Sequence, residues 1–574
     1  MLNHTLRARL KERTQDMGQL SKNAERKLIE LLAQLYQEDV ARQTAERIQA
    51  SLPAEHRVDM HRRNDCMLIS YADSISAPDE MPLQTLRGFL DRRLGDVCGR
   101  VHLLPFYPSS SDDGFAVIDY RMVDHHVGSW GDLEALAEGF DLMFDLVINH
   151  CSRENLWFAD FVGGREPGRN YFITLPEESD TSAVARPRST PLISAVHTYA
   201  GIRHVWNTFS DDQIDLDFTN PEVLCEIIDI LLFYVARGAR LIRLDAVGYL
   251  WKRLGTSCLN LPEAHVVVKI LRLIVDEIDP GVLLVSETNV PHDQNVAYFG
   301  TGDEAHMVYQ FSLPPLLLHS FTFGDSRYLQ AWAANLAPPP PGSTYLNFIA
   351  SHDGIGVRPL EGLVPDEEVT RLVDRMHERG GFVTLRDVGD GAQKPYEINI
   401  SLMSAFGGEE GLPAYLAAHA LCLSFQGSPA IYIHSFLGTL NDLDLVEQTG
   451  RTRSINRRKW QLAELEIALQ DGLAAQVIDQ VSNLVRQRNL QPALAPHAAQ
   501  RVIPVPGALF ALERRCDSQT LIVVCNVTGR YEQVELRQLG LEPGTYHDRL
   551  TETVVTGDPA LRMNPYQTLW LEVS

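Results

Sequence analysis

Polar side chains follow several short apolar runs of this sequence, at positions where they could do chemistry. Four runs end in residues able to transfer protons or attack an electrophile: Asn149 with His150, Asp245, Glu287, and His352 with Asp353. A single acidic residue after a strand is often only a helix N-cap. Four such endings in one chain favour a catalytic site.

Asp245 and Glu287 are suited to breaking a glycosidic bond. That reaction uses two carboxyl groups, one as nucleophile or base and one as proton donor with a raised pKa. Arg243 lies two residues before Asp245, so on a strand both side chains point the same way. Its positive charge is expected to keep Asp245 ionised, as a nucleophile requires.

Eight buried strands are expected to position these side chains. The apolar runs cover residues 67–71, 101–106, 142–148, 240–245, 282–287, 307–311, 345–351 and 430–433. Helical stretches such as 221–238 alternate with them, which indicates parallel βα units. The predicted fold class is α/β, a TIM (β/α)8 barrel whose active site lies at the carboxyl ends of the strands.

Further segments surround the predicted barrel of residues 61–498. Residues 1–60 form a helical extension, with one amphipathic helix expected over about 24–50. Two loop subdomains are inserted at about 151–238 and 354–428. Alternating patterns from Ala499 onward predict a C-terminal antiparallel β domain over 499–574.

Composition excludes several classes of protein. A net charge of -24 would repel a phosphate backbone, so no nucleic-acid partner is expected. The eight cysteines form no CxxC pair, which argues against a zinc site or a disulfide framework. No long apolar stretch is present, so we expect a cytoplasmic protein with no membrane contact. The chemistry requires neither metal nor cofactor, and the oligomeric state is left open.

Four motifs resemble those of the α-amylase superfamily, glycoside hydrolase family 13. They are NH at 149–150, RLDAVGY at 243–249, SETNVPH at 286–292 and SHDGIG at 351–356. Further segments, FSLPPLLLH at 311–319, GTSC at 255–258 and GLVPDEEV at 362–369, are similar to the sucrose phosphorylase branch. The resemblance runs from about Met67 to the C-terminus. It implies retention at the anomeric carbon through a covalent glucosyl enzyme.

The resemblance also implies roles for individual residues. Asp245 corresponds to the nucleophile, Glu287 to the acid/base, and Asp353 to a third carboxylate that holds hydroxyls of the glucosyl ring. The donor site would further include Asp112 with Arg453 on the far hydroxyls, Phe115 as an apolar platform, and His150 and His352 as hydrogen-bond donors. Without their motifs, the two histidines would be read as ordinary core residues.

The group that attacks the glucosyl enzyme defines the branch. Phosphate needs a cation, ideally an arginine, and Arg188 in ARPRS matches the branch's phosphate arginine. The alternative is that Arg186 and Arg188 are two positive charges on a solvated loop and have no role in binding phosphate. Tyr396 and Glu397 in PYEINIS are expected to face the acceptor, although sucrose phosphorylase has Gln where this chain has Glu397.

The predicted function is a retaining α-glucoside phosphorylase that uses a glucoside and inorganic phosphate. SDDGF at 111–115, the PYEIN segment and the N-terminal extension are closer to the branch members that act on glucosylglycerate. Sucrose 6'-phosphate, sucrose and glucosylglycerol remain open as substrates, and so does a phosphate-independent hydrolase or transglucosidase. A noncatalytic barrel is disfavoured because no catalytic carboxylate is missing.

Overall fold

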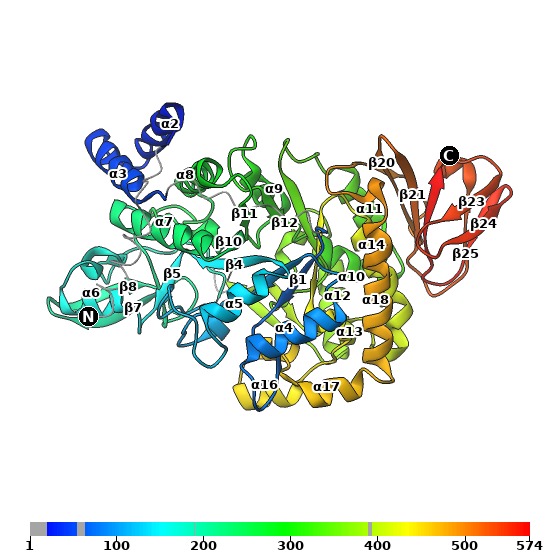
Figure 1. Cartoon of the computed structure of the whole chain (residues 1–574), viewed down its shortest axis with the longest axis horizontal. Helices are drawn as coiled ribbons and strands as arrows, with labels where there is room; N and C mark the ends of the chain where they lie inside the picture. Colours follow the sequence, from blue (N-terminus) through cyan, green and yellow to red (C-terminus); the bar gives the residue numbers. More distant parts are fainter. Residues whose placement is uncertain (1–19, 54–63, 189, 388–392, 574) are drawn as a thin grey trace.

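The computed structural model describes residues 20–53, 64–188, 190–387 and 393–573. The barrel lies at the centre, with a sheet-rich C-terminal domain at one end and the first insertion at the other (Figure 1). Parts of the predicted N-terminal extension, residues 1–19 and 54–63, lie outside the described residues. The predicted domain limits near residues 60 and 498 stay a prediction.

Eight parallel strands close into a barrel, which confirms the predicted fold class. Each strand pairs with two neighbours around the ring, with one register shift between β4 and β10 at Ala239 and Leu241, and each predicted apolar run falls on one of the strands. In chain order they are β1 (Met67–Ser70), β3 (Arg100–Leu103), β4 (Asp141–Val147), β10 (Ala239–Asp245), β11 (Leu283–Ser286), β12 (Met307–Tyr309), β13 (Thr344–Phe348) and β17 (Ser428–Tyr432).

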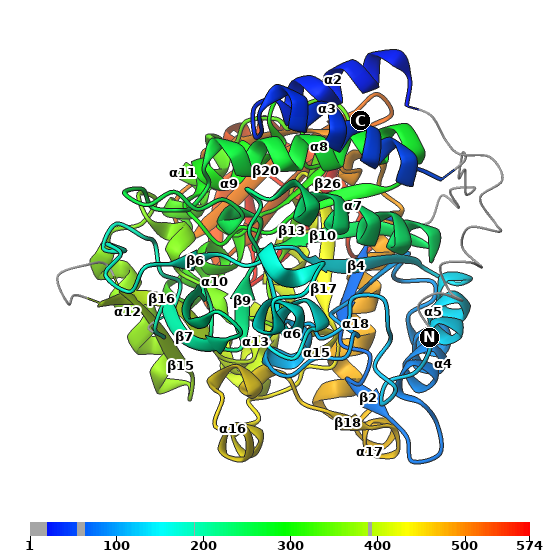
Figure 2. The same cartoon turned by 90° about the vertical axis from the view of Figure 1, so that its left-hand side faces the viewer.

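Helices return the chain from one strand to the next and cover the outside of the barrel (Figure 2). The main ones are α4 (Pro82–Arg93), α5 (Trp130–Ala137), α7 (Pro221–Ala236), α8 (Pro262–Ile278), α10 (Leu313–Phe323), α14 (Leu412–Ser424) and α18 (Leu473–Asn489). Local signals set their starts: before α7, the Asn220 side chain accepts a bond from the Glu222 N–H, and Pro221 takes the first turn. Within the described part of the chain, no helix is both long and apolar enough to cross a membrane.

Two insertions build small sheets above the carboxyl ends of the strands. The first holds β5 (His150–Ser152) paired with β9 (Gln213–Asp215), and a sheet of β6 (Thr174–Leu175), β7 (Ile193–Thr198) and β8 (Gly201–Trp206). The second holds α12 (Asp366–Glu378) and a sheet of β14 (Ile355–Gly356), β15 (Phe382–Asp387) and β16 (Gln393–Asn399). The predicted ranges 151–238 and 354–428 therefore also contain the barrel helices α7 and α14.

The predicted single N-terminal helix is wrong, because the chain forms two helices, α2 (Lys22–Leu32) and α3 (Glu38–Ser51). The chain turns between them because each packs on a different barrel helix, α2 on α8 and α3 on α7. At the turn, the Tyr36 hydroxyl donates to the Phe218 carbonyl at 2.9 Å. The hairpin of α2 and α3 thus packs against the two barrel helices that precede β10 and β11 in the chain.

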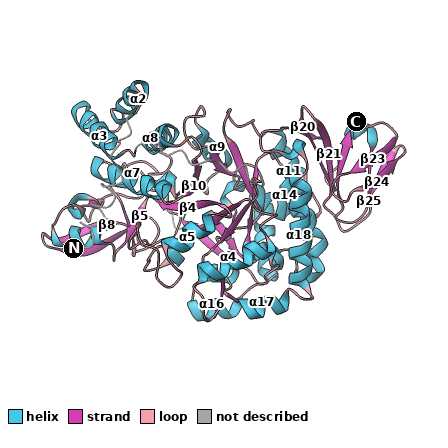
Figure 3. Cartoon of the chain, in the orientation of Figure 1, coloured by secondary structure: helices cyan, strands magenta, loops and turns pink. Residues whose placement is uncertain are grey.

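The C-terminal domain is antiparallel, as predicted, and Figure 3 shows it as almost all strand. Its main sheet has the order β19 (Ala499–Ile503), β20 (Leu509–Cys516), β21 (Gln519–Asn526), β26 (Thr568–Val573), β23 (Gly544–Asp548) and β24 (Thr553–Gly557). A second pair is formed by β22 (Glu532–Glu535) and β25 (Ala560–Met563). Arg514 is fully buried and donates to the Ser424 carbonyl of α14 at 2.7 Å, which ties this domain to the barrel.

Candidate active site

One pocket at the carboxyl ends of the barrel strands brings all twelve predicted site residues together. Its floor comes from the ends of β10, β11 and β13, and its walls come from the two insertions. Residues that the sequence did not single out also line it, notably Gln213, Tyr249, Asn289 and Phe311. Gln213 begins β9 and Tyr249 ends a short 3-10 helix, whereas Asn289 and Phe311 follow β11 and β12.

Asp245 and Glu287 lie side by side because β10 and β11 are adjacent in the barrel. Asp245 ends β10, and Glu287 follows Ser286, which pairs in register with Leu244. Ala246 has a left-handed φ of 51°, and its N–H donates to Glu287 Oε2 at 3.0 Å. The residue after the candidate nucleophile therefore fixes the candidate proton donor.

Arg243 contacts Asp245 as expected, but its charge is shared. Arg243 Nη1 lies 2.9 Å from Asp245 Oδ1 and also bonds Asp145 of β4. Asp145 in turn lies 2.7 Å from the His102 ring. Burial raises the pKa of Asp245, and the Arg243 charge opposes this shift, which is the direction predicted for Arg243. Asp145 was not singled out from the sequence, although an acidic residue inside the apolar run 142–148 could have indicated it.

Glu287 has the electrostatic character of a proton donor. Burial raises the pKa of Glu287, Arg243 opposes the shift, and the nearby Asp353 carboxylate adds to it. A carboxyl group kept protonated in this way can protonate a leaving oxygen near neutral pH.

Asp353 is held by two arginines. Arg453 Nη1 lies 2.7 Å from Asp353 Oδ1, and Arg457 Nη2 lies 3.6 Å from the same oxygen. Although burial acts against them, these cations and His352 hold the pKa of Asp353 well below its usual range. These contacts favour the ionised form of Asp353, and Arg457 is a partner that the sequence did not reveal.

Arg453 contacts two carboxylates of the pocket. Its Nε and Nη2 donate to the two carboxylate oxygens of Glu397 at 2.9 and 2.6 Å, while Nη1 reaches Asp353. Asp112, predicted to bind the far hydroxyls of the sugar together with Arg453, contacts Arg188 Nη2 and Gln213 Nε2, each at 3.2 Å. The Glu397 side chain is turned toward Arg453 because this bidentate contact pairs its buried charge.

Arg188, expected at the phosphate, lies beside a donor-site carboxylate. Burial opposes ionisation of Asp112, but Arg188, Arg453 and Arg457 hold the pKa of Asp112 well below its usual range. The Arg188 guanidinium also lies over the Phe209 ring, 5.8 Å from its centroid. Arg188 thus contacts a residue of the candidate donor site, and its role toward phosphate stays a prediction.

The remaining donor-site residues form a neutral surface. Phe115 stacks on the His352 ring with centroids 5.2 Å apart. The His150 Nε2 lies 3.1 Å from the Phe115 carbonyl and also 3.1 Å from Gln213 Nε2. Burial lowers the pKa of His150 to about 4 and that of His352 to about 3, so both rings are neutral at pH 7.

Lys252 supports the loop that carries His150. Its Nζ lies 2.6 Å from Asp215 Oδ2 and donates to Asn149 Oδ1 at 2.8 Å. Asn149 Nδ2 also donates to Asp215 Oδ2 at 2.9 Å. A fixed ammonium group thus neutralises the fully buried Asp215 behind the pocket wall.

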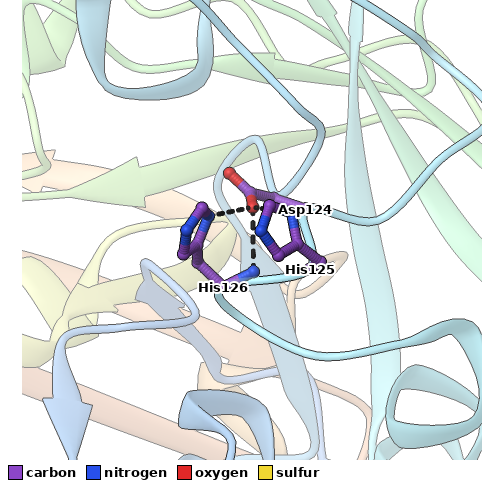
Figure 4. A group of neighbouring side chains, drawn as sticks. All are labelled: Asp124, His125 and His126. Atoms are coloured by element: carbon purple, nitrogen blue, oxygen red, sulfur yellow. Dashed lines mark hydrogen bonds and ion pairs between the residues drawn. The ribbon is translucent and has the colours of Figure 1, made fainter.

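A group able to hold a metal ion lies outside the pocket. Figure 4 shows the imidazoles of His125 and His126 next to the Asp124 carboxylate. The possible ligand atoms of these three residues all lie within 4.8 Å of one another. The backbone N–H and the ring of His126 both contact Asp124 Oδ1 at 2.9 Å, so binding a metal would replace a satisfied contact. None of the three lines the pocket.

Comparisons with known proteins agree with this geometry. Residues 97–334 match the family described as alpha amylase, catalytic domain. The chain is 44% identical to glucosylglycerate phosphorylase of Allomeiothermus silvanus, over 92% of this chain and 94% of that protein. The chain belongs to the α-amylase family, glycoside hydrolase family 13.

Further α-amylase family members extend the match. Glucosylglycerate phosphorylase of Escherichia coli is 41% identical over 89% of this chain and 92% of its own length. The crystal structure of sucrose 6F-phosphate phosphorylase from Thermoanaerobacter thermosaccharolyticum superposes with a TM-score of 0.73 at 27% identity, covering 88% of this chain and 99% of that one. The predicted membership of this family and its phosphorylase branch is confirmed.

Proposed function

We propose that this enzyme is a retaining glucosylglycerate phosphorylase. The reaction converts an α-glucoside of glycerate and inorganic phosphate into α-glucose 1-phosphate and free glycerate. The observation that carries the proposal is the placement of Arg188 in the same pocket as Asp245 and Glu287. The carboxyl pair supports retaining glucosyl transfer, and the arginine supports phosphate as the second nucleophile.

In the first step, the Asp245 carboxylate attacks the anomeric carbon. The bond from that carbon to the acceptor oxygen breaks, and Glu287 gives its proton to the leaving oxygen. Asp353 binds hydroxyls of the sugar ring, and Arg453 keeps Asp353 in place. The product of this step is a glucosyl ester of Asp245.

In the second step, a phosphate oxygen attacks the anomeric carbon from the face that the acceptor has left. The ester bond to Asp245 breaks, and the Glu287 carboxylate takes the proton of the attacking group. Two inversions give net retention. Arg188 offsets the repulsion between phosphate and the carboxylates of the pocket.

The cysteines are consistent with a cytoplasmic location for this enzyme. All eight are free thiols, and seven of them are buried. Unpaired thiols are typical of a reducing compartment.

Product analysis tests the proposal. The protein is incubated with glucosylglycerate, glucosylglycerol, sucrose and sucrose 6'-phosphate, each with and without phosphate. We expect α-glucose 1-phosphate from glucosylglycerate, and only when phosphate is present. Release of free glucose at the same rate with and without phosphate would show a hydrolase instead.

A further inference from the structure

One wall of the pocket contains a buried polar atom that has no hydrogen-bond partner among the described residues. Tyr249 and Asn289 line this wall, and the Asn289 carboxamide rests against the backbone of Gly356. A Cβ at Gly356 would lie 2.7 Å from Asn289 Oδ1, so a larger residue here would displace the Asn289 carboxamide. Asn289 Oδ1 is buried and accepts no hydrogen bond from the described residues. An unsatisfied buried acceptor has a free energy cost that a ligand hydroxyl would remove.

Arg358 lies two residues beyond Gly356, next to the loop expected to face the acceptor. Gly356 pairs with Glu397, and the Val357 N–H donates to the Tyr396 carbonyl at 3.0 Å. Pro359 follows, and its carbonyl accepts a bond from Ser312 Oγ at 3.2 Å. The backbone that carries Arg358 is therefore held on both sides.

The Arg358 guanidinium has no carboxylate partner among the described residues. Its Nε is buried without a hydrogen bond, and it lies close enough to the Tyr249 hydroxyl to offset, by charge and hydrogen bonding, part of the rise that burial causes in the pKa of Tyr249. In contrast, Arg243, Arg453 and Arg457 each contact a carboxylate. In a chain with a net charge of -24, an arginine that lies near the substrate pocket and has no carboxylate partner among the described residues favours the approach of an anion.

We propose that Arg358 and Asn289 form the acceptor subsite, Arg358 binding the carboxylate of a 2-hydroxy acid and Asn289 the hydroxyl on its third carbon. The inference rests on the proposed function. When glycerate carries glucose on its 2-hydroxyl, the carboxylate and the 3-hydroxyl remain free on either side. Guanidinium donors match the carboxylate and Asn289 Oδ1 matches the hydroxyl, so both unsatisfied groups find partners.

Glucosyl transfer from α-glucose 1-phosphate to three matched acceptors tests the subsite. Glycerate has both groups, glycerol lacks the carboxylate, and lactate lacks the 3-hydroxyl. For Arg358→Gln, we expect kcat/KM for glycerate and lactate to fall about 10- to 100-fold and that for glycerol to change less than about 3-fold. For Asn289→Ala, we expect a fall of roughly 5-fold for glycerate and glycerol but not for lactate.

Controls separate recognition from damage to the fold. Arg358→Lys, which keeps the charge, should restore part of the preference for glycerate over glycerol. Arg375→Gln, on the exposed side of α12 and paired with Glu378 at 3.3 Å, should change nothing. The KM for α-glucose 1-phosphate should stay constant in Arg358→Gln.

Three outcomes would contradict the subsite. An equal loss on all three acceptors means that Arg358 is structural, and a rise only in the KM for α-glucose 1-phosphate means that it binds phosphate. An unchanged preference in Arg358→Gln, with wild-type protein active on glycerate, rejects the subsite but leaves the proposed function standing. Wild-type protein that uses no glycerate rejects the proposed function itself.

Discussion

The two sides of the pocket differ in how their charges are satisfied. On the donor side, Arg453 joins Asp353 to Glu397, and Arg243 joins Asp245 to Asp145. On the acceptor side, Arg358 has no carboxylate partner among the described residues. The donor side is thus organised before substrate arrives, whereas the acceptor side depends on the ligand to complete it.

The largest effect is expected from breaking the donor side at its nucleophile. Asp245→Asn should lower phosphorolysis about 10⁴-fold, because an amide cannot form the glucosyl ester. Mass spectrometry should detect that ester on wild-type protein given a fluorinated glucosyl donor, and none on the variant. Asp374→Asn, an exposed carboxylate on α12, serves as control. Retained activity in Asp245→Asn would remove Asp245 from the mechanism.

Arg188 contacts Asp112 on the donor side and is proposed to bind phosphate, so its substitution tests both roles. Arg188→Gln should raise the KM for phosphate about 10- to 100-fold through the loss of charge-assisted hydrogen bonds. The KM for the glucoside should also rise, because Asp112 loses its partner at 3.2 Å, but this rise should be smaller than the rise in the KM for phosphate. Arg186→Gln in the same loop is the matched control, because Arg186 bonds the Thr190 carbonyl and does not line the pocket. An unchanged KM for phosphate would support the alternative, in which Arg188 is a charge on a solvated loop and does not bind phosphate.

The pH profile tests the proton donor. Glu287 must be protonated to act, and burial raises its pKa, so the first step should slow as pH rises through that pKa. Above the pKa, the rate should fall about tenfold per pH unit. Glucosyl fluoride needs no proton donor and should show no such decline, and neither should Glu287→Gln acting on it. A decline of equal steepness in Glu287→Gln would assign the proton to another group.

The smallest effect should decide to which side Glu397 belongs. Glu397→Gln weakens the bidentate contact to Arg453 but leaves the 2.7 Å contact between Arg453 and Asp353. If Glu397 acts through Arg453, kcat should fall roughly 5-fold on every acceptor, with the glycerate-to-glycerol ratio unchanged. A changed ratio would place Glu397 among the groups that touch the acceptor.

The fold was predictable because its signals are local. Parallel strands buried on both faces produce uninterrupted apolar runs, and the residues that end them must meet at one edge of the barrel. The N-terminal hairpin was misread as one helix because the periodicity of 24–50 does not show that two different barrel helices receive its halves.

Partners in the site were less predictable than its members. All twelve predicted residues line the pocket, yet Arg188 and Asp112 are 76 positions apart and no pattern announces their contact. Asn289 and Arg358 stand out only because each has a buried polar atom without a hydrogen-bond partner, and this is seen only in the folded structure. Sequence motifs identify groups that act on the shared sugar, whereas acceptor recognition depends on how the loops fold.

Lys252 gives the pocket a counterion that is part of the chain. A dissolved cation beside Asp215 would exchange with the solvent, and its occupancy would follow the composition of the medium. The Lys252 ammonium, 2.6 Å from Asp215, is tethered by a covalent stem, so its occupancy does not depend on ion concentration. The loop bearing His150 should therefore keep its position at any ionic strength at which the barrel remains folded.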